Sequence, residues 1–321
     1  MHKQVQPILF SPATRALIWG GTALLERWGK KADTPTVAEC WELSSYPGSE
    51  STVTGGCFDG QKLSELVEKE PELFGGAVRG GDFPILVKLI DAAKDLSVQV
   101  HPDEAYARAH GAAHGKTEMW YVAEATPDAA IYYGFARDVS RKEVEESIRD
   151  NTVTSLLRRV PVRRGDTFFV PAGTVHALLG GVTVVEVQQN SDVTYRVYDY
   201  DRRDADGNPR QLHVAQALDV MHYTASVVAP PAPAAAPAPG VGVRPLADCP
   251  LFSVSETIID GGRYAVTPEE GFVTFTITDG EGSFVGGEKI LRGQTWMIPC
   301  RCCTEIEGKG LTLVVTRVKV N

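Results

Sequence analysis

The sequence predicts a mainly β protein with two barrel-like units and a few helices on the first unit. Its 31 glycines and 20 prolines separate many short, valine-rich segments, which favours strands and turns over a helical bundle. Its 321 residues exceed one ordinary domain. A pattern of Gly, five residues and Pro occurs at 165–171 and again at 293–299. Two related barrels explain both the length and the repeat.

The first unit is expected over residues 1–226. Runs of β-branched and aromatic residues between turn residues predict its strands. These strands are expected at 83–93, 96–101, 118–125, 129–135, 163–173 and 182–189. Apolar residues at helical spacing, with charges on the other side, predict helices at 59–75, 101–111, 140–151 and 211–223. The unit is therefore a mostly antiparallel barrel or sandwich with helical additions.

A composition break at residues 227–242 separates this unit from a tail. The segment VVAPPAPAAAPAPGVG alternates alanine and proline, so we expect neither a helix nor a sheet ladder there, but a linker or a surface crossing. The tail, residues 243–321, is predicted to be a small β domain. Its expected strands lie at 271–280, 282–290, 293–299 and 311–320.

Charge and composition exclude several classes of partner. The net charge of −9 and the lack of a basic run argue against nucleic acid, and no apolar run is long enough to cross a membrane. The start, MHKQVQPILF, does not have the pattern of a secretory signal, so we expect a cytoplasmic protein. Six cysteines agree with that compartment. The CRCC cluster at 300–303 has no second group of ligands to follow it, so a metal site there is not favoured.

The segment DLSVQVHPDEAY, residues 95–106, has polar residues on one face of a predicted strand. In an extended chain Val98 and Val100 point one way, while Ser97, Gln99 and His101 point the other way. This second face could be an ordinary solvated surface. It could also supply two ligands to a site.

A turn motif later in the chain favours the site. After Gly165, the sequence continues as Pro171, Gly173 and then His176, a spacing that resembles the second motif of the cupin barrel. The turn directs His176 into the mouth of a barrel, and Glu118 opens another predicted strand. Together Gln99, His101, Glu118 and His176 suit a divalent ion, with zinc as first choice. The alternatives are that His101 caps a helix, that Glu118 pairs with a lysine, and that His176 only shapes its turn.

These motifs together give a resemblance that covers nearly the whole chain. The sequence resembles the type I mannose-6-phosphate isomerases (phosphomannose isomerases) of the cupin superfamily, in their short bacterial form. The segments that carry the resemblance are LIWGG (17–21), ECWELSSYPGSESTV (39–53), FPILVKLIDAAKDLSVQVHPDEAYA (83–107), GKTEMWYV (115–122), VPAGTVHAL (170–178) and VQQNSDVTYRVYDYDR (187–202).

The resemblance implies an activity and a ligand set. Family members interconvert mannose 6-phosphate and fructose 6-phosphate through a cis-enediol. The residues that match Gln99, His101, Glu118 and His176 hold their zinc, which implies one Zn²⁺ per chain here. Two related barrels, of which the second has no metal ligands, are expected, because the tail has Arg301 and Thr304 at the matching glycine and histidine positions.

Further charged residues are candidates for catalysis and substrate binding. Lys88 lies in an apolar strand, and Lys116 shares the face of Glu118 if that strand extends backwards. By resemblance, Arg196 matches an active-site arginine, with carboxylates at Asp192 and Glu186. The alternatives are a lysine that reaches water, a loop lysine and a surface ladder of salt bridges with Arg202 and Arg203. Which group moves the proton stays open.

Two departures and two rival functions complete the prediction. Longer family members often carry histidine just before the residue that matches Lys116, where this chain has Gly115 and places its histidine at His114. The chain also lacks their large helical insert, so a more open pocket is expected. A cupin metalloenzyme of other chemistry, such as another sugar isomerase or a dioxygenase, is one rival, and a non-catalytic sugar-binding regulator is the other. The expected partner is a sugar phosphate, and the oligomeric state stays open.

Overall fold

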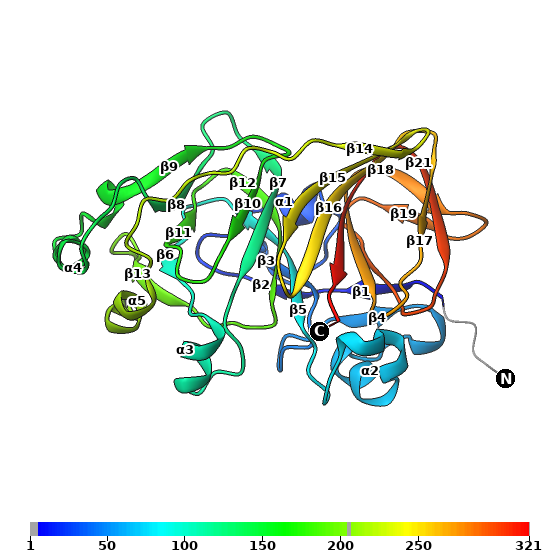
Figure 1. The fold of residues 1–321 in the computed structure, drawn as a ribbon, viewed down its shortest axis with the longest axis horizontal. Helices are drawn as coiled ribbons and strands as arrows, with labels where there is room; N and C mark the ends of the chain where they lie inside the picture. The colour runs from blue at the N-terminus through cyan, green and yellow to red at the C-terminus, as the bar shows by residue number, and fades with distance from the viewer. Residues whose placement is uncertain (1–5, 204–206, 321) are drawn as a thin grey trace.

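The protein is mainly β, in a computed structural model that describes residues 6–203 and 207–320 (Figure 1). Within these residues the strands form three sheets of six, five and ten strands. The six-stranded sheet has the order β10 (Thr167–Val170), β7 (Glu118–Ala125), β12 (Val182–Gln189), β5 (Ile85–Ala92), β3 (Glu39–Leu43) and β2 (Ala13–Arg15). The five-stranded sheet has the order β13 (Tyr195–Tyr198), β6 (Val98–Val100), β11 (His176–Leu178), β8 (Ala130–Phe135) and β9 (Leu157–Pro161).

The ten-stranded sheet contains the strands of the tail. Its order is β14 (Ala235–Ala238), β15 (Val241–Asp248), β16 (Phe252–Ile259), β21 (Thr304–Val318), β18 (Val273–Phe284), β20 (Thr295–Ile298), β1 (Ile8–Ser11) and β4 (Thr52–Thr54). Two further strands pair off this path, β17 (Arg263–Val266) on β21 and β19 (Lys289–Leu291) on β18. All pairings between named strands are antiparallel, so the predicted antiparallel class agrees with the described residues.

Short helices lie outside the sheets. The α-helices are α1 (Ala23–Glu26), α2 (Leu63–Lys69), α3 (Glu104–Ala109), α4 (Arg141–Arg149) and α5 (Val214–Val220). The 3₁₀ helices are η1 (Gly56–Phe58), η2 (Pro71–Ala77) and η3 (Val153–Leu156). Asp103 caps α3 by accepting a hydrogen bond from the Tyr106 amide at 2.8 Å, and Ser140 caps α4 in the same way. Among the described residues no helix has both the length and the apolar character needed to cross a membrane.

The N-terminal strand joins the two halves of the chain. β1 lies beneath the C-terminal strands in Figure 1, and it pairs with β20 so that Leu9 faces Trp296. A buried apolar cluster contains Phe10 from β1, Tyr121 from β7, and Phe252 from β16. The ten-stranded sheet is therefore built from both ends of the sequence. A division of the chain at residues 227–242 does not describe this sheet, because β1 and β4 lie before that segment.

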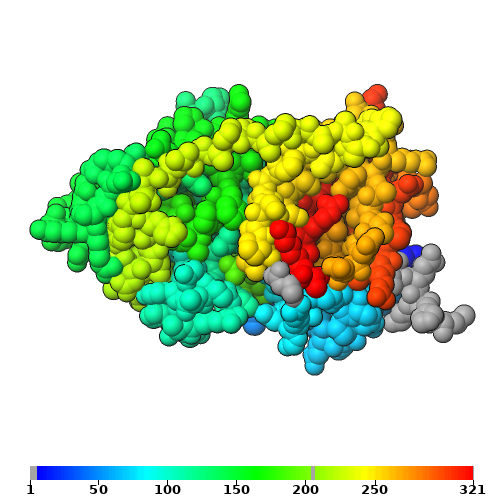
Figure 2. Space-filling view, in the orientation of Figure 1, coloured from blue at the N-terminus to red at the C-terminus, as the bar shows by residue number. Residues whose placement is uncertain are grey.

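The Ala/Pro-rich segment differs from its prediction in one respect. Figure 2 shows the yellow-green chain around it running over the surface from the first half to the second. Residues 235–238 nevertheless form β14, in which Ala235 pairs with Val243 and Ala238 with Val241, so the expectation of no sheet ladder was wrong for this stretch. Pro237 is tolerated because β14 is an edge strand and its register shifts between the two paired alanines.

Two sheets face each other where the predicted site residues lie. A second apolar cluster contains Ile90 and Trp120 from the six-stranded sheet, together with Ile131 and Leu178 from the five-stranded sheet. Successive residues of a strand point to opposite faces, so each of these sheets directs alternate side chains into the shared space. The site occupies part of this space.

Candidate metal centre and catalytic cavity

Strand register places three predicted residues on one face of the five-stranded sheet. Gln99 on β6 pairs with His176 on β11, and on its other side with Arg196 on β13. Residues directly opposite each other on antiparallel strands have neighbouring side chains on the same face. The alternation expected for residues 97–101 is also seen, because Val98 and Val100 are fully buried in a separate apolar cluster.

Three of the predicted ligands form a compact buried group. His101, Glu118 and His176 each offer one ligand atom, and these atoms lie within 4.8 Å of one another. The Nε2 of His101 lies 3.4 Å from Oε2 of Glu118, and the Nε2 of His176 lies 3.3 Å from its Oε1. His176 begins β11 and His101 directly follows β6 of the five-stranded sheet, while Glu118 begins β7 of the facing sheet. This is the donor set of a divalent metal site.

The hydrogen bonds of the two histidines direct their free nitrogens inward. The Nδ1 of His101 is 2.8 Å from the Val193 carbonyl, and the Nδ1 of His176 is 2.8 Å from the Thr174 carbonyl. A protonated Nδ1 donates to its carbonyl, which leaves Nε2 as the metal-facing atom. Within the described part of the chain, Nε2 of His176 and Oε1 of Glu118 are buried without a hydrogen-bond partner, whereas Oε2 of Glu118 faces the ammonium of Lys116 at 2.8 Å. Such atoms are costly unless an ion satisfies them, so this group fits a metal.

The electrostatics favour the ligand forms of these side chains. Burial, assisted by the Lys116 ammonium, lowers the pKa of His101 from 6.5 to about 3, so its imidazole is neutral. Burial also lowers the pKa of His176. Burial would raise the pKa of Glu118, but the Lys116 ammonium holds it well below its ordinary value. Neutral imidazoles and an ionised carboxylate are the forms that bind metals.

The alternative roles of these ligands have mixed outcomes. Asp103, and not His101, caps the helix that follows. Glu118 does pair with a lysine, because Nζ of Lys116 lies 2.8 Å from its Oε2. His176 does contact its own turn through Thr174, but only with Nδ1. The contact of His176 leaves its Nε2 available, whereas the Lys116 ammonium contacts Oε2 of Glu118 and leaves only Oε1 of that carboxylate available.

A cavity of about 320 Å³ lies beside the metal group. Its polar lining includes six residues that the sequence had indicated, namely Lys88, Gln99, Lys116, Glu186, Asp192 and Arg196. Lys116 connects the cavity to the metal group, because its Nζ is 2.9 Å from Nε2 of His101 as well as close to Glu118. The chain therefore brings its predicted ligands and its predicted charged residues to one place.

An acid and a base lie side by side in the wall of this cavity. Nζ of Lys88 is 3.2 Å from Oε1 of Glu186 and 3.9 Å from Glu39, and all three side chains are largely buried. Trp120 donates to Oε2 of Glu186 at 2.8 Å. Burial, together with Glu118, raises the pKa of Glu186. Burial would lower the pKa of Lys88, but Glu186 and Glu39 raise it.

Arg196 differs from the other cations of the cavity because it has no carboxylate partner. Among the described residues it forms no ion pair, while its Nη1 donates to the Gln211 carbonyl at 2.8 Å and its Nε to Ser97 at 3.3 Å. Arg202 and Arg210 instead pair with Asp199, so the alternative ladder of salt bridges does not include Arg196. Burial is the main cause that lowers the pKa of Arg196, and the nearby positive charge of Arg210 lowers it further. Its charge is therefore left for a ligand.

Comparison with known proteins identifies the family. Residues 8–131 match the model described as phosphomannose isomerase type I, catalytic domain. The mannose-6-phosphate isomerase ManA of Bacillus subtilis (strain 168) is 37% identical over 298 residues, which cover 92% of this chain and 93% of that protein. The mannose-6-phosphate isomerase of Streptococcus mutans is 40% identical over 80% of each chain. The chain belongs to the type I phosphomannose isomerase family.

Solved structures agree with this assignment. The crystal structure of the mannose 6-phosphate isomerase from Bacillus subtilis has a TM-score of 0.90 at 35% identity, and the match covers 97% of this chain and 99% of that chain. A mannose 6-phosphate isomerase bound with zinc and yttrium has a TM-score of 0.74 at 17% identity, over 98% of this chain and 99% of that chain. The second comparison shows a common fold alone.

For this phosphomannose isomerase family member, the structure adds residues that the sequence analysis did not single out. Trp120 could have been found, because it lies two positions after Glu118 on the same face of a strand. Arg15 and Glu39 also line the cavity. Arg15 lies outside the segments that carry the resemblance, and Glu39 begins one of them but was not singled out. The guanidinium of Arg15 stacks 3.7 Å above the Trp41 ring, and its Nη1 lies 3.7 Å from Asp192. Only the pairing of β2, β3 and β5 brings these residues to the cavity.

His114 and the CRCC cluster lie outside the cavity. His114 bridges Asp82 at 3.0 Å and Glu104 at 3.2 Å, and it lines a different pocket. In the cluster, Cys300 and Cys302 are buried and Cys303 is exposed. The metal-binding group of His101, Glu118 and His176 is the one found among the described residues, so the cysteines provide no second one.

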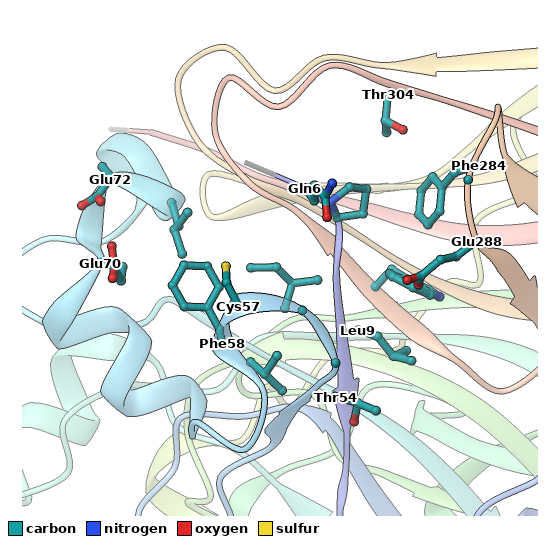
Figure 3. A pocket seen from close by; sticks show the side chains of 18 residues that line it. Gln6, Leu9, Thr54, Cys57, Phe58, Glu70, Glu72, Phe284, Glu288 and Thr304 are labelled. Carbon is teal, nitrogen blue, oxygen red and sulfur yellow. The ribbon is translucent and has the colours of Figure 1, made fainter. Parts of the chain in front are cut away.

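A larger hollow of about 620 Å³ lies at the junction of β1, β4 and the C-terminal strands. Figure 3 shows Phe58 and Phe284 on opposite sides of it, with Glu70 and Glu72 on the helical segment and Glu288 near Phe284. None of the predicted site residues lines it. Volume alone therefore does not mark the site of this family member.

Proposed function

We propose that this chain is a zinc-dependent isomerase that interconverts mannose 6-phosphate and fructose 6-phosphate through a cis-enediol. Two relatives that match most of this chain are named for that activity. The observation that carries the proposal is the juxtaposition of three parts. A buried metal-binding group, a buried acid–base pair and an arginine without an ion pair among the described residues meet at one cavity.

We propose that Gln99, His101, Glu118 and His176 hold one Zn²⁺ per chain. Two imidazoles, a carboxylate and an amide oxygen suit zinc, and Gln99 lies opposite His176 where its side chain can complete the set. When bound, the ion supplies Lewis-acid polarisation of a carbonyl or hydroxyl oxygen, which stabilises an enediolate.

The protein side chains then bind the sugar phosphate and move its proton. Arg196 offers a planar guanidinium to an anionic oxygen of the substrate or of the enediolate. Lys116 lies beside the ligand group and supplies a second cation. The proton between C1 and C2 is taken and returned by a group of the cavity wall, for which Glu186, Lys88 and Asp192 are the candidates. Burial raises the pKa of Glu186 toward the range in which a carboxyl group both accepts and releases a proton.

The finer architecture and location belong to the same proposal. We interpret residues 1–226 and 243–321 as two cupin-like jelly rolls, of which the first holds the metal and the second has no metal ligands. The repeated Gly and Pro spacing supports this interpretation. A cytoplasmic location is supported by the six cysteines, which form no disulfide in the described part of the chain.

The experiment that tests the function separates it from its rivals. Zinc-loaded protein is incubated with mannose 6-phosphate while sugar phosphates are followed by NMR and dissolved oxygen by an electrode. We expect fructose 6-phosphate to form until equilibrium without consumption of oxygen, and mannose without phosphate to react far more slowly. Consumption of oxygen would instead support a dioxygenase. Binding of the sugar phosphate without conversion would support a regulator, and either result would refute the isomerase.

A further inference from the structure

Glu104 on α3 contacts two separate segments of the chain, although it does not line the cavity. Its Oε2 is 2.9 Å from the Gly115 amide and 3.0 Å from Nε2 of Gln189. Its Oε1 is 3.2 Å from Nδ1 of His114 and 2.7 Å from the guanidinium of Arg108. One half-buried carboxylate thus ties α3 to the segment before β7 and to the end of β12.

These contacts continue to the residues beside the metal group. Gln189 links Glu104 to Thr117, because its Oε1 accepts a hydrogen bond from the Thr117 amide at 2.8 Å. The Lys116 amide between them donates to the Pro102 carbonyl at 2.9 Å. The backbone amides of residues 115, 116 and 117 therefore all donate hydrogen bonds. The acceptor for residue 115 is Glu104 itself, and the acceptor for residue 117 is Gln189, which is hydrogen-bonded to Glu104.

The held segment precedes the two side chains on which the site depends. Lys116 and Glu118 are both buried, and they contact each other and His101. A shift of this backbone would move the carboxylate of Glu118 relative to two imidazoles that are fixed on the facing sheet. Catalytic and metal sites lose function through displacements of about 1 Å, so the anchoring of this segment matters for chemistry.

Gly115 has a specific reason to be glycine in this arrangement. A Cβ atom at residue 115 would lie 2.5 Å from the carbonyl carbon of Asp103 and from the amide nitrogen of Glu104. These are backbone atoms at the start of α3 and cannot move cheaply. The chain therefore has no room for a side chain directly before Lys116, and the neighbouring His114 turns outward to Glu104 and Asp82.

We propose that Glu104 is a positioning residue that, through Gly115 and Gln189, sets the placement of Lys116 and Glu118. The inference rests on the proposed function where isomerase turnover is measured. The measurement of Zn²⁺ affinity does not depend on that function. The inference requires that weakening the Glu104 contacts to Gly115 and Gln189 lowers zinc affinity and turnover, without a comparable loss of substrate binding or of the fold.

The test compares Glu104→Gln with Arg108→Gln. Arg108 is an exposed partner of Glu104, and among the described residues it forms no hydrogen bond or ion pair with residues 115–117, so its variant controls for a change in surface charge on α3. For each protein we would measure Zn²⁺ affinity by competition with a chromogenic chelator, kcat and KM for mannose 6-phosphate, and the midpoint of thermal unfolding. Gln189→Leu and the double variant Glu104→Gln/Gln189→Leu test whether the two residues act as one unit.

We expect Glu104→Gln to lower both zinc affinity and kcat by about 10- to 100-fold, the effect typical of groups that orient metal ligands. KM should change by less than about threefold, and Arg108→Gln should match the parent. The double variant should lose no more than the worse single variant, because both act through one network. If Glu104→Gln does not fold, Gln189→Leu should show the same losses alone.

Parental zinc affinity and kcat in the folded variants would overturn the inference, as would losses that only follow a lowered unfolding midpoint. A parent protein without isomerase activity would refute the proposed function instead, and the zinc measurements would still decide the role of Glu104.

Discussion

The Nζ of Lys116 lies 2.8 Å from Oε2 of Glu118, and the same ammonium lies 2.9 Å from Nε2 of His101. The Lys116 ammonium thus contacts two proposed ligand atoms at the place where a metal ion would bind. It partly neutralises a fully buried carboxylate, and it must give up some of this contact when an ion binds. Zinc and Lys116 are therefore expected to compete for Glu118.

Replacing Lys116 by methionine tests this competition. Removing one member of a buried ion pair leaves its partner uncompensated, which typically costs about 3–5 kcal/mol of stability. We expect Lys116→Met to unfold more readily than the parent without zinc, to recover most of that loss with zinc, and to bind zinc at least as tightly. Its turnover should fall strongly. Chemical denaturation with and without zinc provides the measurement, and weaker zinc binding by the variant would contradict the competition.

Arg196→Lys tests the geometry of the anion site. The variant keeps the charge but loses the planar fork that donates two parallel hydrogen bonds. We expect kcat/KM for mannose 6-phosphate to fall by about 10- to 1000-fold, or roughly 1.4 to 4 kcal/mol of transition-state binding. Zinc content should not change. The matched control is Arg149→Lys, an exposed residue of α4. Parental kinetics in Arg196→Lys would place the phosphate and the enediolate elsewhere.

Asp199→Asn tests the charge cluster behind the cavity. Burial would raise the pKa of Asp199, but Arg210 and Arg202 lower it below its ordinary value of 3.8. A carboxyl group whose pKa is lower in the folded state adds stability above its unfolded pKa, and this contribution is lost as the pH falls through the folded pKa. The parent should therefore be more stable than Asp199→Asn at pH 7, and the two should converge below about pH 4. Denaturant unfolding at several pH values measures this difference, and a gap that stays constant as the pH is lowered through this range would show that the ion pairs contribute nothing.

Replacing Cys300, Cys302 and Cys303 by serine tests the assignment of the metal to the first half of the chain. The two buried cysteines should tolerate serine with a loss of about 1–3 kcal/mol each at most, because a buried hydroxyl needs a partner. We expect zinc content to stay the same and turnover to stay within a few fold. Elemental analysis of the triple variant is the measurement. A loss of bound zinc would show that this cluster, and not the histidine group, holds the ion.

Much of the metal group could be predicted because its signals are local. Alternation within residues 97–101 places Gln99 and His101 on one face, and the strands β7 and β12 begin and end at the predicted residues. The turn from Gly165 to Gly173 delivers His176 to the start of β11. Each of these features depends on residues that are close together in the sequence.

The rest of the site depends on pairings between distant strands. No prediction placed a strand at β13, yet its pairing with β6 is what sets Arg196 opposite Gln99. Arg15 and Glu39 reach the cavity because β2 and β3 extend the six-stranded sheet beyond β5. Strand order and the exchange of β1 into the C-terminal sheet have no local pattern, so reasoning from a single sequence does not find them.

Zinc-dependent turnover of mannose 6-phosphate is the decisive measurement for the proposed isomerase. Protein stripped with a chelator is titrated with Zn²⁺ while the formation of fructose 6-phosphate is followed, with His176→Ala as the control that removes one ligand. We expect no turnover in the stripped protein, full recovery at about one zinc per chain, and no recovery in His176→Ala at zinc concentrations that saturate the parent. Full activity in the thoroughly stripped protein, or a His176→Ala variant that holds zinc and isomerises like the parent, would refute the zinc-dependent mechanism.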